Sequence, residues 1–190
     1  MSEGSAFNER RRALEDSFFM ERDRVLLAKL SGELQSMEAK KQLSHVSGIT
    51  DDKVLGNLVL AGVRAETLTA LNLIPLVEVA WSDGAVSAEE RTAVLKASTE
   101  AGIHPDNAAY ELLGKWLQNR PDQQVVAAWK EYVGTLTRMM PMESVATMRE
   151  TTAQRCQRVA EAAGGFLGMG NKISKAEQSA IDEFARAWGA

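Results

Sequence analysis

Four carboxylates surround one short turn in the middle of the chain, and their type and spacing suit the binding of a cation. Glu78 and Asp83 lie on either side of Trp81, where an apolar run ends, and Glu89 and Glu90 follow the turn. Hard cations such as Ca²⁺ bind carboxylate and carbonyl oxygens. The sequence therefore predicts a divalent-cation or partner-binding site formed by Glu78, Asp83, Glu89 and Glu90.

The turn fits only part of an EF-hand calcium loop. With Gly84 at the glycine position of that loop, Asp83 and Glu90 fall at ligand positions. The two earliest ligand positions are then apolar residues, which offer no oxygen. A standard calcium site is therefore not expected. Glu90 also has a second interpretation, because Ser87 and Glu90 have the spacing of a helix-capping box.

A weaker copy of this turn recurs near the C-terminus. A shift of 87 residues places Ser174 on Ser87 and Glu177 on Glu90, so the second turn also predicts a capping box. We interpret the two segments as an internal pseudo-repeat of one helix-to-helix corner. The aliphatic residue before each serine and the glycine after each helix also align: Val86 with Ile173, and Gly102 with Gly189.

Apolar residues recur at helical spacing along most of the chain, and no stretch alternates long enough to predict a strand. Proline and glycine separate the helical segments. We expect an all-α bundle of about seven helices in residues 49–190. The expected helices cover residues 50–62, 65–81 with a break at Pro75, 87–101, 105–119, 122–140, 143–163 and 174–188.

The N-terminal part predicts a separate element. Residues 5–41 contain no proline and are expected to form a long amphipathic helix, and residues 43–48 read as a linker. Residues 1–48 are therefore expected to be separate from the bundle over residues 49–190, with a helix that either lies across its own domain or pairs with another chain. The apolar residues fall close to a coiled-coil seam that is short for a stand-alone coiled coil. Self-association and binding to another protein both stay open. The candidate contact residues are Phe18, Phe19, Leu27, Leu30 and Leu34.

Composition excludes several classes of function. The net charge of -4 and the pI near 5.4 argue against a nucleic-acid surface. The single cysteine, Cys156, rules out an internal disulfide and indicates a reducing compartment. No apolar run is long enough for a membrane span. No catalytic motif with a recognisable spacing occurs, so we expect a cytoplasmic protein that is not an enzyme.

The segment VAWSDGAVSAEERTAVLKASTEAGI resembles the helix-turn-helix signature of the TerB (tellurite-resistance) family. The corresponding residues here are Asp83, Gly84, Val86, Glu89 and Glu90. The resemblance implies an all-helical domain with an acidic surface that binds metal, and a role in bacterial stress response or protein assembly without catalysis. The second corner departs from the pattern, because it has Gly170 and Asn171 in place of Asp and Gly.

The segment FNERRRALEDSFFMERDRVLLAKL also resembles the start of small helical inhibitors of the rotary ATPase. The likeness lies in its charge pattern and a few aromatic residues. It implies an alternative function, in which the protein is a regulator that docks its long N-terminal helix onto a larger assembly.

Overall fold

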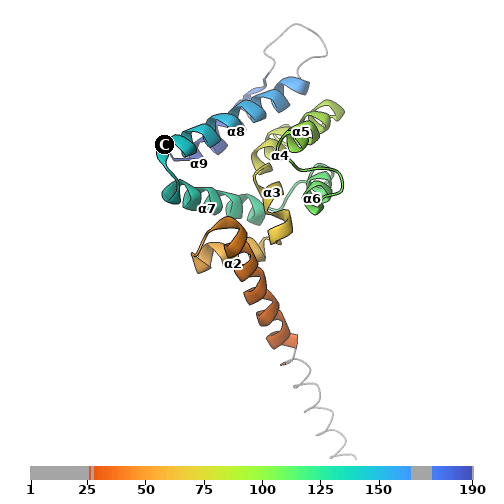
Figure 1. Ribbon diagram of the computed structural model, residues 1–190. Coiled ribbons are helices and arrows are strands. Elements are labelled where there is room, and N and C mark those ends of the chain that lie inside the picture. Colours follow the sequence, from red (N-terminus) through yellow and green to blue (C-terminus); the bar gives the residue numbers. More distant parts are fainter. Residues whose placement is uncertain (1–25, 27, 164–172, 190) are drawn as a thin grey trace, which may run out of the picture.

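A computed structural model describes residues 26, 28–163 and 173–189, and every regular element within them is helical (Figure 1). The predicted all-α bundle is therefore confirmed. A helix over residues 28–47 comes first. It is followed by α2 (Asp52–Leu60), η1 (Ala65–Thr67), α3 (Leu68–Leu71), α4 (Ile74–Ala80), α5 (Ala88–Glu100), α6 (Ala108–Trp116), α7 (Gln123–Met139), α8 (Met142–Ala163) and α9 (Lys175–Ala187).

Helix α4 is the centre of the bundle. Its sequence, IPLVEVA, is apolar on almost every side, and all seven of its residues are buried. A helix that is hydrophobic all round requires neighbours on all of its faces. It packs against α5, α8 and α9, while α2 packs against α7 on another side of the bundle. Figure 1 shows α8 and α9 together at the end of the molecule away from α2.

The long helix α8 turns one side toward this core. Cys156, Val159 and Ala160 are buried on that side. Burial raises the pKa of the Cys156 thiol to about 12, so the cysteine is a neutral packing residue at physiological pH.

Proline and glycine divide the helices where the sequence predicts. Pro75 lies in the first turn of α4, where its missing N–H has no intrahelical partner to lose. The restart predicted at Pro75 is confirmed by α4, and the part of the segment before it is divided into η1 and α3. Gly102 and Gly189 follow α5 and α9 with φ of 81° and 84°, the left-handed conformation that glycine adopts without strain.

The linker predicted over residues 43–48 is wrong, because the first helix continues to residue 47. Leu43 is fully buried and belongs to the same core cluster as Ile49 and Leu58. The Ser47 hydroxyl donates a 2.7 Å hydrogen bond to the Leu43 carbonyl, so the serine is satisfied inside the helix. Gly48, with φ of 71°, then ends it. The burial of Leu43 favours the helix, although the composition of residues 43–48 is typical of a loop.

The earlier turns of this helix extend away from the bundle (Figure 1). Four large apolar side chains lie exposed along one side of it, at spacings of four, four and three residues. We call this row the N-terminal stripe: Leu26 (54% exposed), Leu30 (46%), Leu34 (66%) and Met37 (67%). The predicted contact residues Leu30 and Leu34 belong to it, whereas Phe18, Phe19 and Leu27 lie outside the described residues.

In the described part of the chain no single helix has the length and apolar character of a membrane span. Only the bent pair Asp52–Leu60 and Ala65–Leu71 passes that test together, by length and composition.

The position of Leu43 leads to a prediction about stability. Leu43→Ala leaves a cavity in the core and should lower the free energy of unfolding by about 2–5 kcal/mol. Leu34→Ala, on the exposed part of the same helix, should change it by less than about 0.5 kcal/mol. Urea denaturation of the two variants measures the difference. Equal losses at both positions would show that the end of this helix does not join the core.

Candidate functional site

Glu90 is engaged in holding the first corner together. It is 2% exposed, and its Oε2 accepts hydrogen bonds of 2.8 Å from both the backbone N–H and the hydroxyl of Ser87. The Ser87 hydroxyl in turn accepts from the Glu90 N–H at 3.1 Å. This reciprocal pair satisfies donors that the first turn of α5 would otherwise leave unpaired. The predicted capping box is confirmed, and it uses the Glu90 carboxylate internally.

Two of the predicted carboxylates stay accessible at this corner. Asp83 is exposed, and one of its oxygens accepts a 3.2 Å hydrogen bond from the Ala85 N–H, which closes the turn around Gly84. Glu89 is exposed in the first turn of α5. A carboxylate there interacts favourably with the positive end of the helix dipole.

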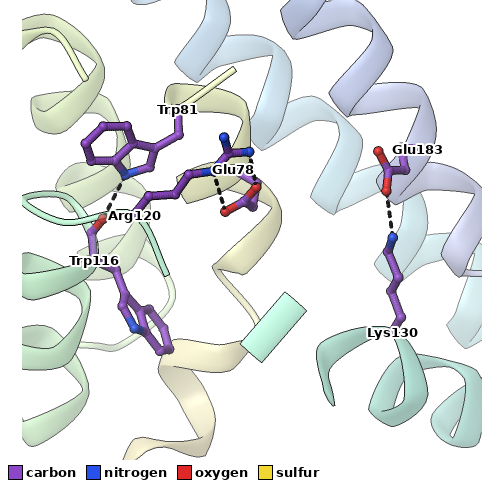
Figure 2. Close-up of polar contacts among 6 residues, drawn as sticks. All are labelled: Glu78, Trp81, Trp116, Arg120, Lys130 and Glu183. Carbon is purple, nitrogen blue, oxygen red and sulfur yellow. Dashed lines mark hydrogen bonds and ion pairs between the residues drawn. The ribbon is translucent and has the colours of Figure 1, made fainter. Parts of the chain in front are cut away.

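Glu78 is not available as a ligand, because its charge is neutralised by an arginine. It is buried on α4 and forms an ion pair with Arg120, with Oε2 at 2.7 Å from Nη2 and Oε1 at 3.4 Å from Nε (Figure 2). Glu78 and Glu90 are thus both used within the fold. Among the described residues, no group of three or more His, Cys, Asp or Glu side chains is arranged to hold a metal ion. The four predicted ligands do not come together.

The second corner repeats the local geometry of the first. Ser174 caps α9, and Ser174 and Glu177 form the reciprocal capping box that the sequence predicts. The two corners also lie within electrostatic range of each other. Burial raises the pKa of Glu90 against the lowering effect of the Ser87 hydrogen bonds, and the negative charges of Asp83 and Glu177 raise it further. The pseudo-repeat of the whole fold stays a prediction.

Beside the first corner lies a polar cleft of about 240 Å³, where α4, α7 and α9 meet. Two ion pairs border it (Figure 2). One is Glu78 with Arg120, and the other joins Lys130 on α7 to Glu183 on α9 at 2.6 Å. The second pair is far more open to solvent than Glu78. We call this recess the ion-paired cleft, and its further lining includes Ser82, Gln123, Ser179 and Phe184.

Ser82 contributes an unsatisfied polar atom to the cleft. Its Oγ is buried and has no hydrogen-bond partner among the described residues. A serine nucleophile is activated by a hydrogen-bonded base, and this hydroxyl has none in the part of the chain described. The cleft therefore offers charged groups that already neutralise each other, together with the exposed Ser179 and the buried hydroxyl of Ser82.

The end of α6 is fixed so that Arg120 can reach Glu78. The Trp81 indole N–H donates a 2.8 Å hydrogen bond to the Trp116 carbonyl (Figure 2), and the Arg91 guanidinium donates at 2.6 Å to the Leu117 carbonyl. These donors satisfy carbonyls that the last turn of a helix leaves unpaired. The corner residues of α4 and α5 thereby tie down the segment that carries Arg120.

Arg120, Lys130 and Glu183 are the residues of this site that sequence reasoning missed. Arg120 lies 42 residues from its partner, and Lys130 lies 53 residues from Glu183. No spacing rule connects positions so far apart. The one local signal was the proline after Arg120, which predicts a helix break and hence a segment free to approach another helix.

Comparisons with family models, curated proteins and solved structures find no significant match to this chain. The TerB resemblance therefore rests on the residues of the first corner and their weaker copy, and it stays a prediction.

The Glu78–Arg120 pair predicts unequal effects of three substitutions. Arg120→Met leaves a buried carboxylate without its partner, which should lower the free energy of unfolding by about 1–3 kcal/mol. Lys130→Met removes a solvent-exposed pair and should cost less than about 1 kcal/mol. The double variant Glu78→Met/Arg120→Met should recover most of the loss, because no buried charge is left unpaired. Chemical denaturation of the variants at neutral pH tests this. A double variant with a lower free energy of unfolding than Arg120→Met would contradict it.

The raised pKa of Glu90 predicts a pH dependence. A carboxyl whose pKa is higher in the folded protein contributes stability below its ordinary value of 4.5, and this contribution is lost as the pH rises through the folded pKa. Glu90→Gln keeps the acceptor of the capping box but does not titrate. The stability of the wild type relative to this variant should therefore fall as the pH rises from about 4 through the folded pKa of Glu90. Glu89→Gln controls for the loss of one charge, and a relative stability that rises over this range would refute the expectation.

Proposed function

We propose that this protein is a non-enzymatic scaffold of TerB-like type that binds a partner protein through the N-terminal stripe. One observation carries the proposal: a helix that extends from the bundle exposes three leucines and a methionine in a single row. Scattered apolar residues are normal on protein surfaces, but a contiguous row on a projecting helix is typical of an interaction site.

The charges beside the stripe favour a particular kind of partner. With 3.6 residues per helical turn, Glu33 and Glu38 lie along its two opposite edges, and both are exposed. Lys29 and Lys41 lie toward the two ends of the stripe. Its middle is therefore flanked by Glu33 on one side and Glu38 on the other. This arrangement fits an amphipathic partner helix that carries basic residues beside its own apolar row.

A second copy of the same chain fits this surface less well. In a parallel pair, Glu33 of one chain would lie near Glu38 of the other, which is repulsive. The described stripe spans 12 residues, from Leu26 to Met37, and stable coiled coils usually require several heptads. A partner of complementary charge is therefore the occupant that we propose.

The role in stress response rests on the resemblance of the first corner to the TerB signature. Asp83 and Glu89 are the carboxylates of that corner that a partner or cation can reach, since Glu78 and Glu90 are used internally. The alternative role, a regulator similar to inhibitors of the rotary ATPase, would use the same helix. The two roles differ in the identity of the partner.

The proposal is tested with the full-length chain and a synthetic helix of about three heptads that carries Leu at a and d and Lys at e and g. Fluorescence anisotropy of the labelled peptide reports binding. The double variant Leu30→Asp/Leu34→Asp should weaken binding by at least about tenfold, because two buried leucines are lost. Leu60→Asp, at a position 78% exposed on α2, should leave binding unchanged.

Two further measurements decide the nature of the occupant. A peptide of the same apolar sequence with Glu at e and g should bind at least about tenfold more weakly, and equal binding of both peptides would refute the charge argument. Sedimentation of the chain alone should show a monomer. A stable dimer that dissociates in the Leu30→Asp/Leu34→Asp variant would show that the stripe binds a second copy of this chain and not a different partner.

A further inference from the structure

A second cavity, of about 240 Å³, lies on the side of the bundle formed by α8. We call it the α8 cavity. Its apolar base is made by Leu73, between α3 and α4, by Ile103 after α5, and by Trp188 at the end of α9. These three side chains are 1%, 2% and 4% exposed. The cavity therefore has a rigid apolar floor made from three separate parts of the fold.

One face of α8 supplies the polar wall of this cavity. Thr147, Thr151 and Arg155 follow one another at spacings of four residues and all line the cavity, as does Thr152. Residues four apart lie above each other on a helix. The Thr147 hydroxyl already donates a 2.9 Å hydrogen bond to the Glu143 carbonyl. Thr151, Thr152 and Arg155 therefore supply the hydrogen-bond donors that face the apolar floor.

Arg155 gives this wall a positive charge that the fold does not neutralise. Within residues 26, 28–163 and 173–189, Arg155 takes part in none of the ion pairs. It also borders a neighbouring recess with Lys96 and Arg158. The single carboxylate there, Glu100, pairs with Arg158 at 3.3 Å. The surroundings of Arg155 are electropositive, although the chain as a whole is acidic.

The floor also holds an unsatisfied donor. The indole nitrogen of Trp188 is buried and has no hydrogen-bond partner among the described residues. Because this nitrogen lies below the cavity surface, its N–H reports on a ligand that covers the ring and is not itself a contact for the ligand. The α8 cavity thus combines an apolar floor, an available guanidinium and the hydroxyls of Thr151 and Thr152.

We infer that the α8 cavity binds a small monocarboxylate with an apolar body. The carboxylate would pair with Arg155 and accept from the Thr151 and Thr152 hydroxyls, while the apolar body would cover Leu73, Ile103 and Trp188. Arginine is the residue best suited to a planar carboxylate, because its guanidinium donates two parallel hydrogen bonds. The volume lies below the ~300 Å³ at which pockets for drug-sized ligands begin, which fits a ligand of one ring or a short chain.

The test uses phenylacetate and hexanoate as probes, with phenylacetamide as the uncharged analogue of the first. Proton–nitrogen correlation spectra of the full-length protein follow the titration, and the indole N–H signal of Trp188 is assigned by its loss in Trp188→Phe. Both carboxylates should shift this signal and the amide signals of Thr147 and Thr151 saturably, with Kd about millimolar, as expected for ligands of this size. Phenylacetamide should bind at least about tenfold more weakly.

Arg155→Gln should raise the Kd for phenylacetate at least about tenfold, since a charge-assisted pair is lost. Arg149→Gln, an exposed arginine on the same helix, is the matched control and should bind like the wild type. Thermal melting verifies that both variants are folded. The proposal is overturned if phenylacetate causes no saturable shift at these signals, if the amide binds as well as the carboxylate, or if folded Arg155→Gln binds like Arg149→Gln.

Discussion

The complete burial of α4 is the constraint on which the rest of the structure depends. Every residue of this helix is inside the bundle, including Glu78. A carboxylate in that position is costly unless an opposite charge and hydrogen bonds accompany it. Arg120 supplies both, and it can do so because Trp81 and Arg91 fix the end of α6. The burial of α4 therefore accounts for three features together: the first corner, the path of the chain after α6 and the ion-paired cleft.

A cluster of three aromatic residues connects the ion-paired cleft with the α8 cavity. Trp129 is fully buried and makes edge-to-face contacts with Phe184 and Trp188, with ring centroids 5.1 and 6.3 Å apart. Phe184 lines the ion-paired cleft, and Trp188 lines the α8 cavity. One lining residue of each recess is thus positioned by packing against the same buried tryptophan. Rigid walls of this kind reduce the entropy lost when a ligand binds.

The features that the sequence predicted are those that depend on neighbouring residues in the chain. The two capping boxes, the helix restart at Pro75 and the left-handed glycines after α5 and α9 each follow from a spacing of a few residues. The failures share the opposite property. Leu43 is held in a helix by contacts with the core, and Arg120 meets Glu78 across 42 residues. Tertiary packing decides both, and no local pattern records it.

The same distinction changes the meaning of the acidic corner. In sequence, Glu78, Asp83, Glu89 and Glu90 form a dense group of carboxylates that suits a cation. In the fold, Glu90 serves the cap of α5, and Glu78, on the buried helix α4, is neutralised by Arg120. Half of the acidic signature is thus engaged in contacts within the fold and is not free to bind a ligand. The same spacing is expected wherever a capped helix follows a buried one. Of the four carboxylates, Asp83 and Glu89 are the two that can contact a ligand or partner at the surface.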